Sequence, residues 1–261
     1  MALNKKKKKK KKKRNNGITC FFILVFAVIV FFYFRQGRTD EAPESSRIID
    51  PEKPMIALTI DDGPSTLWSP RILDCLEANG AVATFFEVGK NVEAMPEISK
   101  RAFDLGCEIG SHTYSHLNLP SASEADLNAD REKCIKVFSD ALGNIPTLMR
   151  PPGGALSSSV KSYYNVPFIG WSLDTEDWRT RNAESTVECI RSCSDLNRQV
   201  VLMHSIYEST AEAVEVIVPW LLDQGYQLVT VSELLEYGYG VKPQNGTYYT
   251  VDFFLYGAEP N

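Results

Sequence analysis

Two neighbouring carboxylates, Asp61 and Asp62, directly follow an apolar run, residues 55–60, and precede a Gly-Pro pair. The apolar run is typical of a buried strand, and the Gly-Pro pair predicts that a turn ends it. A buried strand that ends in two acids places charge at the rim of a core, where carboxylates must be hydrated, paired or bound to a metal. Asp-Asp-Gly-Pro alone is more often a plain turn. Its chemical meaning therefore depends on what else reaches the same rim.

The chain contains three histidines, His112, His116 and His204. His112 and His116 are four residues apart, so on a helical turn both imidazoles would face one side and could share a metal. Two imidazoles and one carboxylate make an open zinc site that leaves a position for water. Asp61 and Asp62 offer that carboxylate, so one of them could ligate the metal while the other accepts a proton.

Further polar groups follow later apolar runs. Arg150 opens an Arg-Pro-Pro-Gly-Gly loop, where it could hold a catalytic Asp ionised or form only a surface salt bridge. The glycines of this loop would let a backbone N–H approach a developing oxyanion. Asp174 ends the run 168–173 and His204 ends the run 199–203. Asp174 as a partner would orient the His204 ring and favour the imidazolium, although a lone histidine at a rim is more often simply hydrogen-bonded.

The elements that would position these groups are strands and helices in alternation. Ser69-Pro70 and Ser123-x-x-Asp126 predict the starts of two of the helices. The alternation predicts a parallel α/β fold, an irregular (β/α)7-8 barrel in which reacting groups lie at the C-terminal ends of the strands. The predicted strands are residues 55–60, 82–88, 107–111, 147–149, 168–173, 199–203 and 227–231.

Five short motifs, in order along residues 55–240, resemble those of the polysaccharide deacetylases with a NodB homology domain, carbohydrate esterase family 4. The chain departs from the family pattern at Gly153, where an aromatic is usual, and at Ile60, where Phe is usual. The motifs read Thr59-Ile60-Asp61-Asp62-Gly63-Pro64, His112-Thr113-Tyr114-Ser115-His116, Arg150-Pro151-Pro152-Gly153-Gly154, Asp174-Thr175-Glu176-Asp177-Trp178 and Leu202-Met203-His204.

The resemblance implies an NodB-type barrel and a metal-dependent deacetylase similar to peptidoglycan N-acetylglucosamine deacetylases. It implies that Asp62, His112 and His116 bind a divalent metal, usually Zn²⁺, with Co²⁺ or Ni²⁺ as alternatives. Asp61 would be the general base. The resemblance further implies that His204 is the acid that protonates the leaving amine, with Asp174 as the partner that tunes its pKa. Arg150 would pair with a catalytic carboxylate, and the Gly153 N–H would donate to the oxyanion. Trp178 and Leu202 would form walls of the substrate pocket.

The N-terminal region predicts a membrane anchor. Residues 17–34 carry no charge and would span about 27 Å as a helix, just enough for a bilayer core. The preceding lysines place the N-terminus in the cytoplasm and the body outside the cell. A cleaved signal peptide is the rival, but no small-x-small site follows Phe34. The predicted divisions are a cytoplasmic tail 1–16, a signal anchor 17–34, a stalk 35–54, a deacetylase domain 55–240 and a tail 241–261.

Charge and cysteine content narrow the function classes. The net charge is −5, but residues 5–14 hold ten of the 28 basic residues, which leaves 18 against 33 acids, or about −15, elsewhere. An acidic body disfavours nucleic acid as a partner.

Of six cysteines, Cys20 lies in the predicted anchor and no Cys-x-x-Cys pattern occurs, so the others are predicted to be mostly small buried apolar residues.

Together these features predict an extracellular, membrane-anchored N-deacetylase of the cell's own envelope. N-acetylglucosamine of peptidoglycan is the favoured substrate, with N-acetylmuramic acid as an alternative. Chitin oligomers, xylan or an exopolysaccharide are alternatives with the same chemistry. A non-catalytic glycan-binding protein is the alternative of another class, but it would not need a general base beside a metal. A zinc peptidase is disfavoured because the chain has no His-Glu-x-x-His.

Overall fold

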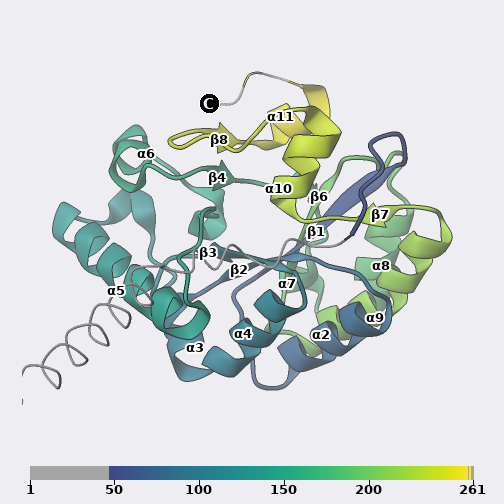
Figure 1. Ribbon diagram of the computed structural model, residues 1–261, viewed down its shortest axis with the longest axis horizontal. Helices are drawn as coiled ribbons and strands as arrows, with labels where there is room; N and C mark the ends of the chain where they lie inside the picture. Colours follow the sequence, from purple (N-terminus) through teal and green to yellow (C-terminus); the bar gives the residue numbers. More distant parts are fainter. Residues whose placement is uncertain (1–46, 258, 260–261) are drawn as a thin grey trace, which may run out of the picture. The chain divides into compact units, whose positions relative to one another are not determined.

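The computed structural model describes residues 47–257 and residue 259 of the chain (Figure 1). The predicted tail 1–16, the predicted anchor 17–34 and most of the stalk 35–54 lie outside this part. In the part that is described, no helix combines the length and the apolar character needed to cross a bilayer.

A parallel sheet is built around β1 (Met55–Asp61), a strand whose seven residues are all buried. Its neighbours are β2 (Thr84–Glu87) and β6 (Val200–His204), with β3 (Glu108–Ser111) beyond β2 and β5 (Leu173–Asp174) beyond β6. β7 (Gln227–Leu228) pairs with the start of β1. All these pairings are parallel, which confirms the predicted α/β fold.

A second, short ladder extends the sheet. β4 (Phe168–Ile169) pairs in parallel with β8 (Tyr248–Tyr249), and Met149 bridges β3 to β4. Between residues 47 and 257 no strand pairing connects β8 back to β5, so the arrangement is open rather than a closed barrel. β4 and β8 lie side by side near the C-terminal helix in Figure 1.

The prediction of one strand over residues 168–173 is wrong, because this segment changes partners along its length. The N–H of Gly170 donates to Tyr249 O of β8, whereas the N–H of Ser172 donates to Val200 O at the start of β6. The chain therefore leaves one ladder and joins another within two residues. It forms two short strands in place of one.

The alternation along β1 explains why its end is polar. Ile56, Leu58 and Ile60 belong to the main core between sheet and helices, whereas Ala57 belongs to a second apolar cluster on the opposite face. Successive strand residues point to opposite faces, so Asp61 shares the face of Ala57. That face changes from apolar to charged toward the C-terminal end of the strand, which brings a carboxylate to the rim.

Helices cover the sheet, and side chains cap the starts of four of those that the structure describes, α5, α6, α8 and α10. α5 begins with the predicted capping box at Ser123 and Asp126. α2 instead begins at Trp68, and Ser69 does not cap it, because the Ser69 hydroxyl accepts a hydrogen bond from Ser65 N–H. The helices are α2 (Trp68–Ala78), α3 (Gly89–Ala94), α4 (Pro96–Asp104), α5 (Glu124–Leu142), α6 (Ser158–Tyr164), α7 (Asp177–Thr180), α8 (Ala183–Arg191), α9 (Glu208–Asp223), α10 (Val231–Glu233) and α11 (Val251–Tyr256), with short turns η1 (Leu119–Ser121), η2 (Pro152–Gly154) and η3 (Leu234–Gly238).

The segment after residue 240 is part of the packed body as far as residue 257. It supplies β8 and α11, and Phe253 and Phe254 of α11 are buried in the second apolar cluster. Their rings pack against Tyr239 at centroid distances of 5.0 and 5.8 Å. The five cysteines of the described region are all free thiols. The prediction that most of them are buried is wrong, because only Cys107 and Cys134 are buried and the other three are half-buried.

Candidate active site

Six of the predicted residues gather at one rim of the sheet. The C-terminal ends of β1, β2, β3 and β6 and the loops that follow them form this rim. The six residues are Asp61, Asp62, His112, His116, Arg150 and His204. β1 ends at Asp61, level with His204 of β6 in the strand register. Asp62 follows β1, and His112 follows β3. The sequence predicted this meeting because parallel strands bring their carboxyl ends to one edge of a sheet.

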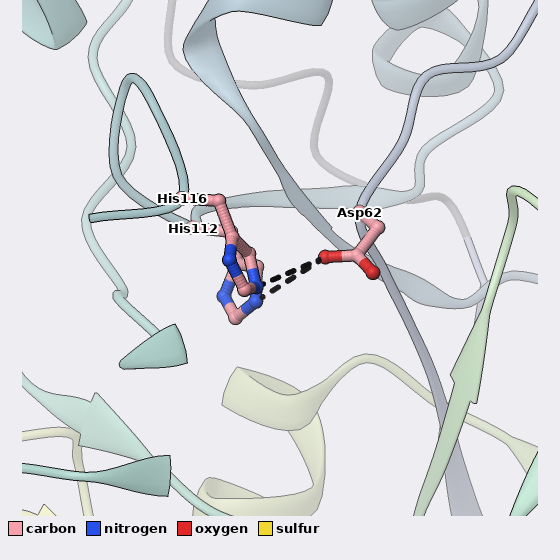
Figure 2. A group of neighbouring side chains, drawn as sticks. All are labelled: Asp62, His112 and His116. Carbon is pink, nitrogen blue, oxygen red and sulfur yellow. Dashed lines mark ion pairs between the residues drawn. The ribbon is translucent and has the colours of Figure 1, made fainter. Parts of the chain in front are cut away.

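Asp62, His112 and His116 form a compact group of three donors (Figure 2). Asp62 Oδ1 lies 3.5 Å from Nε2 of His112 and 3.5 Å from Nε2 of His116. The two imidazole rings are 5.0 Å apart and inclined at 64°. Ligands bonded to one zinc ion at about 2.0–2.1 Å in a tetrahedron lie roughly 3.3 Å from each other, close to the two observed separations.

The donor chemistry of this group also fits a metal. Asp62 Oδ1 is buried and has no hydrogen-bond partner, which is costly for a carboxylate unless a cation compensates it. The Nδ1–H of His112 donates to Arg150 O at 2.7 Å, which leaves the Nε2 lone pair directed at the group. Burial lowers the pKa of His112 to about 3, so this imidazole is neutral at physiological pH, as a metal ligand must be.

The prediction that His112 and His116 share a helical turn is wrong. Thr113 and His116 both have positive φ, 64° and 56°, so the segment is a loop. Buried Asp130 of α5 holds this loop, because its Oδ1 accepts from the N–H of Tyr114 at 2.8 Å and its Oδ2 accepts from the N–H of Ser115 at 3.1 Å. The two imidazoles therefore converge through a clamped loop. Sequence analysis missed Asp130, which carries no signal beyond being an acid on a helix.

Arg150 is fully buried and connects the base candidate to the metal group. Its NH1 donates to Asp61 Oδ1 at 2.8 Å and to Thr59 Oγ1 at 2.7 Å. Its other guanidinium nitrogens donate to the carbonyls of Ile169 and Gly170 at 3.2 and 2.7 Å. Arg150 is therefore a buried ion-pair partner and not a surface cation. Through its carbonyl it also fixes the ring of His112.

The charge state of Asp61 follows from two opposed effects. Burial raises the pKa of the carboxyl, while the nearby Arg150 cation lowers it, and the balance leaves the pKa above its ordinary value. Only Oδ1 is taken up by Arg150, and Oδ2 lies 3.8 Å from His112 Nε2, next to the donor group. Oδ2 is thus the oxygen placed to accept a proton.

The partner of His204 is Asp177, which corrects the prediction that Asp174 orients this ring. The Nδ1–H of His204 donates to Asp177 Oδ1 at 2.8 Å, and the His204 backbone N–H donates to Asp177 Oδ2 at 2.8 Å. The fully buried Asp177 also accepts from Thr210 Oγ1 at 2.6 Å. Asp174 instead accepts from the N–H of Glu176 in a local turn. The cause is Glu176, whose left-handed φ of 53° starts α7 and places Asp177 beneath His204.

This pairing sets the protonation of His204. Burial lowers the pKa of the imidazole, but the hydrogen bond and the charge of Asp177 outweigh burial, and the pKa rises above its ordinary value. His112 and His204 are therefore shifted in opposite directions. Burial decides the shift at His112, whereas the pairing with Asp177 decides it at His204.

The remaining predicted residues lie around this centre. Gly153 is exposed in η2 with φ 63°, and a Cβ there would meet no atom within 4 Å. Gly154 is more constrained, because a Cβ there would lie 2.8 Å from the Trp171 ring. Trp178 is 46% exposed, whereas Leu202 is buried in β6 two residues before His204.

Comparison with known proteins gives a consistent result. The family profile "Polysaccharide deacetylase" matches residues 49–166. A peptidoglycan-N-acetylglucosamine deacetylase of Bacillus cereus is 35% identical over 207 residues, which are 76% of this chain and 93% of that protein. The peptidoglycan-N-acetylglucosamine deacetylase PgdA of Listeria monocytogenes is 40% identical over 195 residues, 74% of this chain. The match spans only 41% of the PgdA chain.

Solved structures agree with the sequence comparison. The structure of the peptidoglycan deacetylase PdaC from Bacillus subtilis superposes with a TM-score of 0.70 at 36% sequence identity. The superposition covers 74% of this chain and 95% of that one.

Proposed function

The chain belongs to the polysaccharide deacetylase family, and from this premise we propose that it is a metal-dependent hydrolase that removes N-acetyl groups from peptidoglycan N-acetylglucosamine. The observation that carries the proposal is the presence of two buried hydrogen-bonded pairs, Asp61 with Arg150 and His204 with Asp177, at the rim that also carries the three-donor group. A carboxylate and an imidazole, each held in place by a charged partner, can serve as the base and the acid of one reaction.

The donors Asp62, His112 and His116 would hold the metal. One carboxylate and two imidazoles favour Zn²⁺, and Co²⁺ or Ni²⁺ suit the same ligands. A bound divalent cation would polarise the acetyl carbonyl and make water a stronger nucleophile at neutral pH.

Asp61 would act as the base. Its Oδ2 accepts a proton from the water that attacks the acetyl carbon, while Arg150 keeps Oδ1 in place. The raised pKa of this carboxyl makes it a better proton acceptor than an exposed aspartate. The Gly153 N–H is proposed to donate to the oxygen that gains negative charge as the water adds.

His204 would act as the acid. Asp177 occupies Nδ1, so Nε2 is the nitrogen that can give up a proton. As the C–N bond breaks, its electron pair stays on the sugar nitrogen, which takes the His204 proton and leaves as an amine. Acetate is the other product. Trp178 and Leu202 are proposed to contact the sugar ring and the acetyl methyl.

The proposed setting is the outer face of the cell membrane. It rests on the charge and apolar pattern of residues 1–34, with the lysine-rich end in the cytoplasm. A membrane-held, outward-facing enzyme would meet the cell's own wall polymer first.

Acetate release tests the proposal. The purified chain is stripped with chelator, given Zn²⁺, Co²⁺ or Ni²⁺, and incubated with peptidoglycan and, separately, with chitin oligomers. We expect metal-dependent acetate from peptidoglycan, and we expect Asp61→Asn to lose turnover while it still binds metal. Asp223→Asn, an exposed acid at the end of α9, is the matched control and should behave like the wild type.

The contrary outcomes are distinct. Acetate from chitin oligomers alone would keep the chemistry and overturn the envelope substrate. An Asp61→Asn variant that differs from the wild type in neither metal binding nor turnover would favour a non-catalytic glycan-binding protein.

A further inference from the structure

A cation lies beside His204 without a carboxylate partner. The Nε–H of Arg181 donates to Trp178 O at 2.7 Å, and its guanidinium carbon lies 3.4 Å from the centroid of the Tyr207 ring. The Tyr207 ring is in turn 6.0 Å from the ring of His204. Across residues 47–257, no ion pair to Arg181 forms. Arg181 is exposed, so its positive charge faces solvent, and only the Tyr207 ring separates it from His204.

The backbone of Arg181 adopts a left-handed conformation, which directs the side chain toward Tyr207. Arg181 ends α7 in the left-handed conformation, with φ 49° and ψ 38°. That conformation is unfavourable for a residue with a side chain, and helices commonly use glycine for it. Strain of this kind concentrates at functional sites. Arg179, two residues earlier on the same helix, instead forms an ion pair with Glu176.

The remaining donors of Arg181 match a planar anion. The Nε–H is taken up by Trp178 O and the guanidinium also interacts with the Tyr207 side chain, so the remaining terminal N–H groups are those that can pair with a carboxylate. Stacking on Tyr207 orders the guanidinium in advance, so little rotational freedom is lost when an anion binds.

Resting on the deacetylase function proposed above, we propose that Arg181 selects the substrate by binding a carboxylate on the sugar next to the one being deacetylated. Peptidoglycan carries such groups, because every second sugar bears a lactyl ether whose carboxyl is free or joined to an acidic peptide. Chitin carries none. Outside residues 5–14 the chain has 18 basic and 33 acidic residues, so its net negative charge would repel a polyanionic substrate. The positive charge of Arg181 at the rim would offset this repulsion where the substrate binds.

A purely structural role for Arg181 predicts something different. If the side chain only closes α7 over the Trp178 carbonyl, its loss would shift the neighbouring α7 and Asp177 and slow the reaction on every substrate alike. Recognition of a carboxylate predicts a loss confined to substrates that carry one.

The test compares three substrates: peptidoglycan glycan strands freed of peptides, the same strands with their carboxylates converted to neutral amides, and chitin pentamer. The purified full-length, metal-loaded chain is used as wild type, Arg181→Gln, Arg181→Lys and the matched control Arg179→Gln. We expect amidation to lower kcat/KM of the wild type roughly tenfold, mainly through KM. Arg181→Gln should show that loss on the charged strands and equal the wild type on the neutral substrates. Arg181→Lys should lie between, and Arg179→Gln should match the wild type.

Two results would overturn the proposal: an equal loss on charged and neutral substrates, or no loss on any. Failure of the deacetylase function has a separate signature, which is no acetate from any substrate with wild type. In that case calorimetric binding of the charged and amidated strands decides the role of Arg181. Weaker binding of the charged strands by Arg181→Gln would uphold it, and equal binding would reject it.

Discussion

Replacing Asp177 by Asn removes one negative charge from a buried network and keeps its shape. Asp177 accepts four hydrogen bonds, from the N–H of Trp178, from Thr210 Oγ1, and from both the ring and the backbone N–H of His204. A carboxamide can accept only on its oxygen, so its NH₂ group would face two of these donors. Breaking a buried charged pair in this way typically costs about 3–5 kcal/mol, and we expect Asp177→Asn to lose stability of that order.

Asp177→Asn should also alter the protonation of His204, the proposed acid. His204 has a raised pKa because Asp177 outweighs the opposing effect of burial. Without that charge, the opposing effect of burial has more weight and the pKa of His204 falls. A smaller share of the imidazole is then protonated at neutral pH, and loss of a general acid typically lowers kcat by about 10²–10⁴-fold. The alkaline limb of the pH–rate profile should move to lower pH.

The raised pKa of His204 also determines how the stability lost in Asp177→Asn depends on pH. Protonated His204 stabilises the folded wild type fully below the unfolded-state pKa of histidine, and this contribution is lost as pH rises through the raised folded-state pKa. Asp177→Asn should therefore lose most stability relative to wild type at mildly acidic pH.

Three measurements check this reasoning: NMR titration of the His204 ring, kcat against pH, and urea unfolding at several pH values. Asp174→Asn is the matched control, because Asp174 accepts only a local hydrogen bond from Glu176 and should leave the His204 pKa unchanged. An unchanged His204 pKa in Asp177→Asn, or a larger shift in Asp174→Asn, would refute the assignment of Asp177.

Four further substitutions probe the surroundings. Asp130→Asn should loosen the histidine loop and weaken zinc affinity about 10–100-fold in a calorimetric titration, with the fold retained; unchanged affinity would show that the loop holds itself. Arg150→Met leaves a buried carboxylate unpaired and should lower the free energy of unfolding in urea by about 3–5 kcal/mol, and a neutral effect would contradict the pairing. Gly154→Ala should cost about 1–3 kcal/mol from its clash with Trp171, and Gly153→Ala only about 1–2 kcal/mol from its left-handed backbone; equal denaturant midpoints would argue against the packing.

The sequence predicted the site well where one strand determines it. Asp61 ends a fully buried strand and Asp62 follows it, so their place at the rim follows from burial and strand direction alone. His204 was placed by the same argument on β6. The fold class followed because parallel strands alternating with helices have few ways to bury both faces of a sheet.

The errors occurred where distant residues decide local geometry. Asp174 and Asp177 are both acids just after a strand, and the choice between them depends on Thr210 and His204, which lie about thirty residues further on. The histidine loop is decided by Asp130 on a separate helix rather than by its own spacing. The segment beyond residue 240 carries no pattern that indicates its pairing with β4, which contacts alone determine.

The position of β1 in the chain has a consequence for the order in which the protein becomes functional. Asp62, His112 and His116 all come from the first half of the chain, and β1 reaches β3 through β2 alone. His204, the proposed acid, arrives with β6, whose contact with β1 closes a loop of more than 140 residues, as in the bond from Thr59 Oγ1 to Val201 O. Long loops close late because their entropy must be lost before any contact repays it. During synthesis the proposed metal ligands would thus be complete well before the proposed proton donor emerges, and a nascent chain would be able to bind an ion before it could turn over substrate.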